Sequence, residues 1–417
     1  MLKALLPVLV LVCAAPLSAQ PAPQDPPAHQ HDMSSMASGS WMVMYDGALF
    51  ATFNDQGSPR GQQEFKAQNW FMVMADHPLG PGQLTLKGMF SAEPLTVTKR
   101  GYSELFQMGE AYHNLENIDY QHPHDLFMQL TAAWRVPIGS HAGVTVAGGP
   151  VGEATLGPPA FMHRVSASEN ATAPLTHHTL DSTHIVEGVV AAGVDIGPWQ
   201  IEGSAFRGRE PDENRWDLET GSLDSWAARV WFRPSKSLAA QVSYGFLKEP
   251  EQLEPGDERR TTASISWMRG DDDRYLATTF AVGHNERIFD THTTGYLGEA
   301  TIHQDLNSVY GRFEVLQVTS EHLLFPTVVH RPHPGELIDW LAAYTVGAVR
   351  DVSRRGPFEV GVGGDVTAYT VPTRLVTSPQ VQLYGPHPVS FHVFLRVRPR
   401  APAMGHMWNM TMLTPGM

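Results

Sequence analysis

The sequence predicts an all-β protein, an antiparallel up-and-down transmembrane β-barrel of about sixteen strands, within a range of fourteen to eighteen. Three observations predict this fold. Segments of about 9–15 residues alternate between apolar and polar side chains, short and long connections follow each other in turn, and no apolar run after residue 19 is long enough for a transmembrane helix. Barrel strands alternate because one face meets lipid and the other faces the lumen.

The alternation is clearest around four charged residues. Arg229 lies on the face opposite Val230, and Arg312, Glu314 and Arg396 likewise oppose apolar neighbours, so we expect these four charged side chains to line a pore. A soluble antiparallel sandwich also has alternating faces and is the alternative. The expected strands are 41–54, 62–76, 83–91, 125–137, 142–149, 184–196, 198–208, 223–234, 237–248, 259–269, 274–287, 293–303, 306–319, 336–350, 357–370 and 389–398.

The lengths of the connections favour the barrel over the sandwich. Short turns such as 138–141 and 270–273 alternate with long links such as 92–124 and 150–183. Outer-membrane barrels have short turns at the periplasmic end and long loops at the outer end. Because the expected strand count is even, both ends of the barrel segment should lie on the short-turn side.

Aromatic residues near the strand ends are typical of the girdles that barrels place at the two membrane interfaces. We expect this position for seven residues. They are Trp41, Trp70, Trp134, Trp199, Trp267, Trp340 and Tyr344.

The segments outside the expected barrel predict secretion. Residues 1–19 have the pattern of a cleaved signal peptide. Residues 20–40 have that of a flexible Pro/His/Met-rich leader, and residues 399–417 form a Met/His-rich tail. The barrel is therefore expected over 41–398. A lipoprotein at Cys13 is the alternative. Since Cys13 is the only cysteine, a disulfide scaffold is excluded, and the net charge of -14 argues against a nucleic-acid partner.

Four sequence runs carry a resemblance to known proteins. AGGPVGEATLGPPAFMHR, THHTLDSTHI, GREPDENRWDLE and LDSWAARVWFRP are similar to runs in an uncharacterised family of bacterial outer-membrane β-barrel proteins, and the similarity covers residues 41 to about 320. The resemblance implies the fold and an outer-membrane location. It implies no chemistry, because the family has none assigned.

The long link from Gly157 to Ile185 has no periodic pattern, and loops of this length are usually functional. Its imidazoles and carboxylates form a candidate metal site, because these groups bind Zn, Cu or Ni. The spacing matches no known zinc motif, so a gating loop held by hydrogen bonds is the alternative. The candidates are His163, His177, His178, Asp181 and His184.

A second cluster, at 113–127, ends the link before the fourth expected strand. His122, His124 and Asp125 are its candidate ligands, although two histidines two positions apart give a weak metal signal. If this link and the Gly157–Ile185 link meet at the same mouth, their imidazoles would form one site. A polar plug is the alternative.

The leader and the tail hold a third set of candidates. Thioether and imidazole groups suit Cu(I), and segments without a core give methionine no packing role. We therefore expect copper or silver capture there. The residues are His29, His31, Met33 and Met36 in the leader and Met404, His406, Met407, Met410 and Met412 in the tail.

These patterns together predict a porin-like channel of the bacterial outer membrane that passes small polar or ionic solutes. The protein is not expected to be an enzyme, and no cofactor is predicted for it except copper as the candidate metal. Outer-membrane lipid and a small solute or metal ion are its expected partners. The alternatives are a plugged barrel that binds metal and a lipid hydrolase using Ser182 with His184, although no GxSxG motif occurs.

Overall fold

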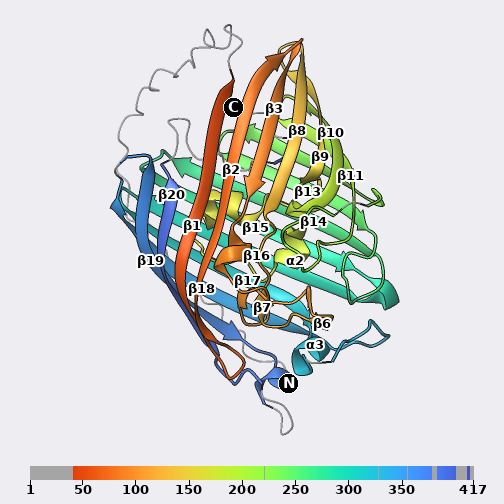
Figure 1. Cartoon of the computed structure of the whole chain (residues 1–417), viewed down its shortest axis with the longest axis vertical. Coiled ribbons are helices and arrows are strands. Elements are labelled where there is room, and N and C mark those ends of the chain that lie inside the picture. The colour runs from red at the N-terminus through yellow and green to blue at the C-terminus, as the bar shows by residue number, and fades with distance from the viewer. Residues whose placement is uncertain are drawn as a thin grey trace. The chain divides into compact units, whose positions relative to one another are not determined.

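The structure is a computed structural model that describes residues 41–219, 221–326, 328–354, 356–377, 383–400 and 411–413. Sixteen strands form a closed antiparallel barrel in chain order, and β20 pairs with β1 to close it (Figure 1). They are β1 (Met42–Gly57), β2 (Gln63–Leu79), β3 (Gly82–Phe90), β8 (Phe127–Ile138), β9 (Ala142–Gly152), β10 (Val186–Ile196), β11 (Trp199–Phe206), β12 (Ser225–Ser235), β13 (Leu238–Leu247), β14 (Glu258–Gly270), β15 (Arg274–Glu286), β16 (His292–Gln304), β17 (Asn307–Thr319), β18 (Ile338–Ser353), β19 (Phe358–Thr370) and β20 (Val389–Pro399).

The predicted barrel is confirmed, and each of the sixteen expected segments overlaps one of its strands. The start of β1 and the end of β20 lie on the side of the short turns, as the even count requires. The expected signal peptide and leader lie outside the described residues. No helix in the described ranges has the length and hydrophobicity needed to cross a membrane.

Short elements that the alternation did not predict lie in the long connections. The small strands are β4 (Tyr102–Ser103), β5 (Ala111–Tyr112), β6 (Leu115–Glu116) and β7 (Tyr120–Gln121). The α-helices are α1 (Glu93–Thr96), α2 (His177–Leu180), α3 (Ser320–Leu324) and α4 (Thr373–Val376). The 3-10 turns are η2 (Phe161–His163), η3 (Val165–Ala167), η4 (Ser182–His184) and η5 (Ile288–Asp290).

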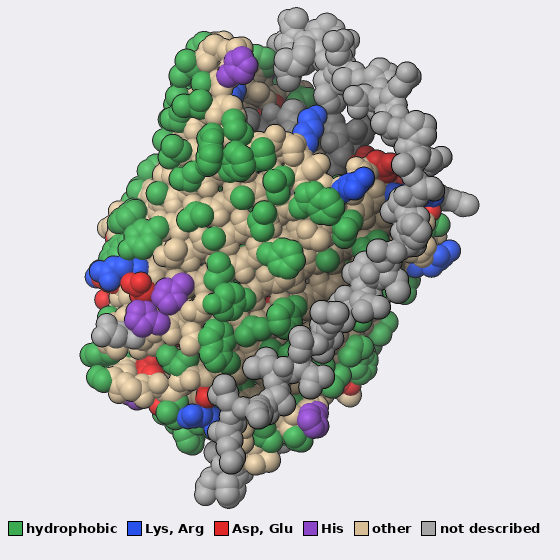
Figure 2. Space-filling view, turned by 180° about the vertical axis from the view of Figure 1, so that it is seen from behind, with side chains coloured by type: hydrophobic (Ala, Val, Ile, Leu, Met, Phe, Trp, Pro, Cys, Tyr) green, Lys and Arg blue, Asp and Glu red, His purple; other side chains and the backbone are tan. Residues whose placement is uncertain are grey.

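The outer wall of the barrel is apolar. Phe280 on β15 is 61% exposed and Val346 on β18 is 66% exposed. The polar residues that alternate with such apolar residues along each strand are buried inside the barrel. Figure 2 shows hydrophobic side chains spread over the outer wall, with few charged side chains among them. A wall of this kind faces lipid, because exposed aliphatic side chains gain nothing from water.

Trp70 corrects the predicted aromatic girdle. It shares the inner face of β2 with the buried Met72 and Met74, and it packs against the methionines of that face and the ring of His163. The expectation was wrong because Trp70 lies near the middle of β2, as it does in the predicted segment 62–76, and its even position points it inward.

Two long connections, loop 91–126 and loop 153–185, fold into the barrel. Figure 1 shows α2 of loop 153–185 inside the ring of strands. Inner-wall side chains bind this loop: Arg312 donates to the carbonyl of Thr172 (3.0 Å), and Glu314 accepts from the amide and hydroxyl of Thr176 (2.9 Å each). The polar inner wall therefore contacts folded protein chain at this level.

Arg164 is a buried anchor of loop 153–185. Its guanidinium lies 2.6 Å from a carboxylate oxygen of Asp181 and 2.8 Å from one of Glu299 on β16, and all three side chains are almost fully buried. Four strands further along the wall, Arg396 of β20 binds Glu169 of the same loop. Charged groups at two places on the wall thus fix the loop in the lumen.

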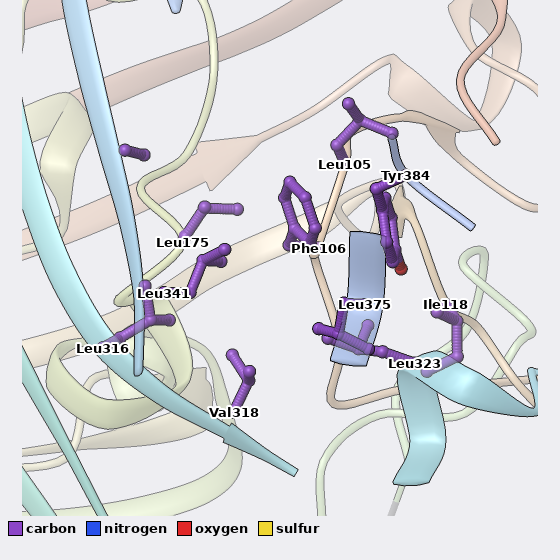
Figure 3. Close-up of a cluster of buried hydrophobic side chains, with 11 residues drawn as sticks. Leu105, Phe106, Ile118, Leu175, Leu316, Val318, Leu323, Leu341, Leu375 and Tyr384 are labelled. Atoms are coloured by element: carbon purple, nitrogen blue, oxygen red, sulfur yellow. The ribbon is translucent and has the colours of Figure 1, made fainter. Parts of the chain in front are cut away.

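An apolar cluster joins loop 91–126 to the loop-side end of the barrel (Figure 3). The ring of Phe106 lies 4.2 Å from that of Tyr384, and Leu175 brings loop 153–185 into the same cluster. The buried members are Leu105, Phe106, Ile118, Leu175, Leu316, Val318, Leu323, Leu341, Ala343, Leu375 and Tyr384.

Residues 411–413 lie inside the barrel, which differs from the expected unpacked tail. Met412 is 2% exposed and packs with Leu413 against an apolar cluster that includes Phe206. The ammonium of Lys87 donates to the carbonyls of Thr411 (2.7 Å) and Met412 (3.3 Å). Met412 therefore has a core to pack into, unlike the role expected from composition.

Candidate metal centre

Five histidines from the two inner loops line one small cavity of about 30 Å³, which we call the histidine pocket. His122 and His124 come from the end of loop 91–126, just before β8. His177 and His178 begin α2, and His184 ends η4. The structure therefore brings together candidate ligands that lie more than fifty positions apart. The sequence identified them only as two separate clusters.

Four of these imidazoles are oriented by hydrogen bonds at Nδ1. Carboxylates accept from three of them: Glu110 from His122 (2.7 Å), Glu93 from His124 (3.0 Å) and Asp181 from His177 (2.7 Å). His184 bonds the carbonyl of Asp181 (2.9 Å).

A carboxylate or carbonyl partner places the proton on Nδ1 and leaves the lone pair on Nε2. Within the described part of the chain, none of the four Nε2 atoms makes a hydrogen bond, and that of His184 is fully buried. This tautomer and this outer hydrogen bond are the arrangement of metal-binding histidines.

The imidazole rings are also spaced about as far apart as two rings that bind the same metal ion. The centroid of His177 lies 5.1 Å from that of His184 and 5.4 Å from that of His178, and His124 lies 5.9 Å from His184. Two imidazoles on one tetrahedral ion have centroids roughly 5 Å apart when each nitrogen is about 2 Å from the ion. The rings must draw inward slightly, since their nitrogens do not yet form a group within 4.8 Å of one another.

Burial keeps most of these rings neutral. It lowers the pKa of His122 to about 4 against the opposing charge of Glu110, and it lowers the pKa of His177 and, further, that of His184. Burial also lowers the pKa of His124, but the charge of Glu93 and its hydrogen bond with the ring together raise this pKa by more. Neutral imidazole is the form that binds metal, so three of the four are ready ligands at neutral pH.

His178 belongs to a second donor group with Glu210 and Glu251, whose ligand atoms lie within 4.8 Å of one another. The Nδ1 atom of His178 is buried without a hydrogen-bond partner. Its ring is fixed by Gly109, where an added Cβ would lie 2.6 Å from Nδ1 and where φ is +115°. Burial, and then repulsion from Glu110, raises the pKa of Glu210 to about 8, and burial and Glu210 raise that of Glu251 further.

Acidic residues and one arginine complete the pocket. Arg215 lies 2.7 Å from Glu110 and 3.5 Å from Asp125, and burial raises the pKa of Asp125 to about 6. Asp181, a predicted ligand, is occupied by Arg164 and His177, so it orients His177 instead of facing the cavity. The site expected from the sequence did not include Glu110, Glu210 and Arg215. Single acidic and basic residues in separate loops form no local pattern that would indicate a site.

Two predicted residues lie elsewhere or have other partners. His163 packs on Trp70 and lines a separate cavity of about 70 Å³, which His124 also lines. Ser182 accepts a hydrogen bond from Arg260 (2.7 Å), whereas His184 bonds Asp181, so Ser182 and His184 do not form a nucleophile and base pair. Another possible donor group, His284, Glu286 and His292, lies at the loop-side ends of β15 and β16.

The four expected pore-lining residues all lie on the inner wall, and each is buried. Arg229 donates to Glu202 (2.8 Å) and to the carbonyl of Gly157 (2.9 Å), so it binds loop 153–185 as Arg312, Glu314 and Arg396 do. The leader and tail candidates lie outside the described residues, apart from the buried Met412. They are His29, His31, Met33, Met36, Met404, His406, Met407 and Met410.

No protein-family model matches the sequence, and no curated protein matches it. OprB of Pseudomonas putida, in a high-pH structure, is similar over 88% of this chain and 95% of its own, with a TM-score of 0.52 and 8% identity. The anion-selective porin from Comamonas acidovorans (86% and 99%, TM-score 0.49, 10% identity) and the outer-membrane channel DcaP of Acinetobacter baumannii (87% and 98%, 0.48, 9%) are also similar.

The likeness to OprB shows a shared barrel fold. The resemblance to an uncharacterised family stays a prediction, because no family comparison supports it. A closed barrel of sixteen antiparallel strands, with a polar inner wall and an apolar outer wall, spans the bacterial outer membrane. The predicted location is thereby confirmed, with loops 91–126 and 153–185 entering the lumen from the long-loop side.

Proposed function

We propose that this protein is an outer-membrane metal-binding barrel that holds a divalent transition-metal ion in the histidine pocket. One observation carries the proposal: four imidazoles around one cavity each place Nδ1 within hydrogen-bond distance of a carboxylate or carbonyl oxygen, and their Nε2 atoms make no hydrogen bond among the described residues. A plug that only filled the lumen would not need the same nitrogen left unbonded in four rings.

The charge around the pocket supports a cation. Glu251 is buried and Glu210 partly buried, with ligand atoms close to each other and with Glu110 nearby. Arg287 lies 3.3 Å from Glu251, and Arg215 contacts Glu110 and Asp125. Burial and mutual repulsion raise the pKa of both glutamates, and a bound divalent ion would replace their protons by favouring the ionised form. Imidazole ligands suit Cu(II), Ni(II) and Zn(II), and the usual affinity order places Cu(II) first.

Calorimetric titration of the refolded full-length chain in detergent with Cu(II) and Zn(II) tests the proposal. The double variant His177→Gln, His184→Gln should bind at least about 100-fold more weakly, because two ligands are lost. His141→Gln, at an exposed short turn, is the matched control and should bind as the wild type does. Unchanged affinity and stoichiometry in the double variant would contradict the proposal.

Capture of metal by the leader and the tail is a separate part of the proposal and rests on composition alone. The variant His29→Ala, His31→Ala, His406→Ala isolates it. If this variant, and not the pocket variant, loses the tight site, the ion is bound by the end segments and the pocket is a plug.

A solute channel is a second candidate function, favoured by the charged inner wall at Arg229, Arg312, Glu314 and Arg396. Since these residues bind loop 153–185, conduction requires that loop to move. Planar-bilayer recordings of the refolded protein should then show discrete conductance steps. A barrel that never conducts, including when loop 153–185 is destabilised, would exclude this function.

A further inference from the structure

Seven methionines gather on the inner side of the barrel, in a group that we call the methionine cluster. They come from four neighbouring strands, β1, β2, β3 and β8, and from η2 of loop 153–185. From the sequence, Met42, Met44, Met72 and Met74 lie on expected strands and are interpreted as packing of the wall or the lumen. Met44, Met72, Met74, Met89 and Met128 are buried, with Met42 and Met162 partly buried beside them.

The strand register sets several of these side chains directly opposite one another. Met44 on β1 pairs with Met74 on β2, and Met72 on β2 pairs with Met89 on β3. Directly opposite residues on one face of a sheet have Cβ atoms about 5 Å apart. Because a methionine side chain has three rotatable bonds, four thioethers so placed can turn their sulfurs toward one point.

The outer face of the same strands has a different composition. Val43 and Tyr45 flank Met44 on β1, and Phe71 and Val73 flank Met72 on β2. The chain thus uses branched and aromatic residues toward lipid and methionine toward the lumen. Methionine fills irregular gaps in a core, but leucine, isoleucine and valine define a core better. Gap filling accounts for one or two methionines and gives no reason why all five buried members are methionine.

Negative charge borders the cluster on the inner wall. Asp46 pairs in register with Met72, and Asp76 pairs with Met42. Asp76 is 2% exposed and receives a hydrogen bond from Thr85 on one carboxylate oxygen, while the other oxygen is buried without a partner. The ammonium of Lys87, which lies opposite Met74 in the strand register, donates to the carbonyls of Thr411 and Met412, and its positive charge also acts on Asp76. An unpartnered buried carboxylate oxygen beside soft sulfur donors favours a bound cation.

We propose that the methionine cluster is a binding site for a soft monovalent cation, Cu(I) or Ag(I). Thioether sulfur is the soft ligand that a chain offers in the absence of thiolates, and it binds poorly to divalent ions that prefer nitrogen and oxygen. The site goes beyond the proposed function, because it uses other residues and another class of ion. Ile185 lines the histidine pocket and also packs against the methionine cluster, so the two sites adjoin.

Titration of the refolded full-length chain with Ag(I), a redox-stable probe, tests the site. The variant Met72→Leu, Met74→Leu removes two sulfurs at nearly constant volume, so the core stays packed. We expect at least a tenfold loss of Ag(I) affinity and fewer Ag–S contacts in X-ray absorption. Met108→Leu with Met268→Leu, two methionines outside the cluster, is the matched control and should retain both.

The Met-rich tail is tested separately by Met404→Leu, Met407→Leu, Met410→Leu, which should keep the tight Ag(I) site. Unchanged affinity and Ag–S contacts in the Met72, Met74 variant, or loss of the site in the tail variant, would overturn the inference. Zn(II) titration of the Met72, Met74 variant distinguishes the two sites. This variant should bind Zn(II) with wild-type affinity, whether or not its Ag(I) affinity is reduced.

Discussion

The two inner loops are held in the barrel by different forces. Loop 153–185 is fixed by buried ion pairs, with Arg164 between Asp181 and Glu299 and with Arg396 on Glu169. Loop 91–126 supplies most of its own buried apolar contacts through the cluster around Phe106. Its ion pairs include Asp119 with Arg60 (2.6 Å) and, with the 207–224 connection, Glu110 and Asp125 with Arg215.

The difference determines how each loop responds to damage. A buried ion pair that loses one partner leaves an uncompensated charge in a place without water, so the loss is large and abrupt. An apolar contact loses free energy in proportion to the area and cavity left behind. Loop 153–185, which carries three of the pocket histidines, should therefore be held or released as a unit, and loop 91–126 should loosen by degrees.

The variant Arg164→Met should have the largest effect, because it leaves the buried Asp181 with His177 and the buried Glu299 with Arg312 as their remaining ion-pair partners among the described residues. We expect a loss of about 3–5 kcal/mol from the free energy of unfolding of loop 153–185. Hydrogen exchange over 153–185 measures the loss directly, and bilayer conductance should rise if the freed loop leaves the lumen. Arg274→Met, which breaks an ion pair with both partners more than half exposed, is the control and should cost less than about 1 kcal/mol.

The variant Phe106→Ala should come next, with a loss of about 3 kcal/mol from the apolar cluster. Hydrogen exchange should speed up over 102–121 and stay nearly unchanged over 153–164. Leu95→Ala, at a position 73% exposed on α1, should change neither. Equal exchange in both loops of the Phe106 variant would show that they unfold together, contrary to the comparison.

A pH effect on loop 153–185 should be the smallest. Burial, helped by the charge of Lys87, lowers the pKa of His163 to about 4. The unfolded loop takes up a proton near pH 6.5 that the folded loop cannot bind, so lowering the pH from about 6.5 toward 4 removes stability.

The expected loss is roughly 1–3 kcal/mol, reduced by the water-accessible cavity beside the ring. His163→Phe should remove this part of the dependence, and His141→Phe should leave it in place. Hydrogen exchange at pH 7 and pH 5, corrected for intrinsic rates, measures the difference. A wild-type dependence that persists fully in His163→Phe would assign it to other groups.

The sequence predicted the barrel well because alternation is local and repeats sixteen times. The opposite orientations of Arg229 and Val230 can be predicted from their own strand, without information on distant residues. Trp70 misled the girdle prediction because it was assigned to a strand end, although it lies mid-strand in the predicted segment 62–76 as well as in β2.

The site was predicted only in part. His122 and His177 stood out by local density, but Glu210 and Glu251 come from two other loops whose approach depends on barrel closure. The methionine cluster was missed for a similar reason. Met44, Met74 and Met89 are scattered along the sequence, and only the strand register brings them together.

The contact between Lys87 and residues 411–413 constrains the order of assembly. Lys87 lies on the third barrel strand, whereas its partners follow the last strand by more than ten positions. Contacts this distant in sequence form late, since the entropy of closing the intervening chain must first be offset. Because β20 seals the barrel against β1, residues 411–413 must reach the lumen through its short-turn mouth or before the seam closes.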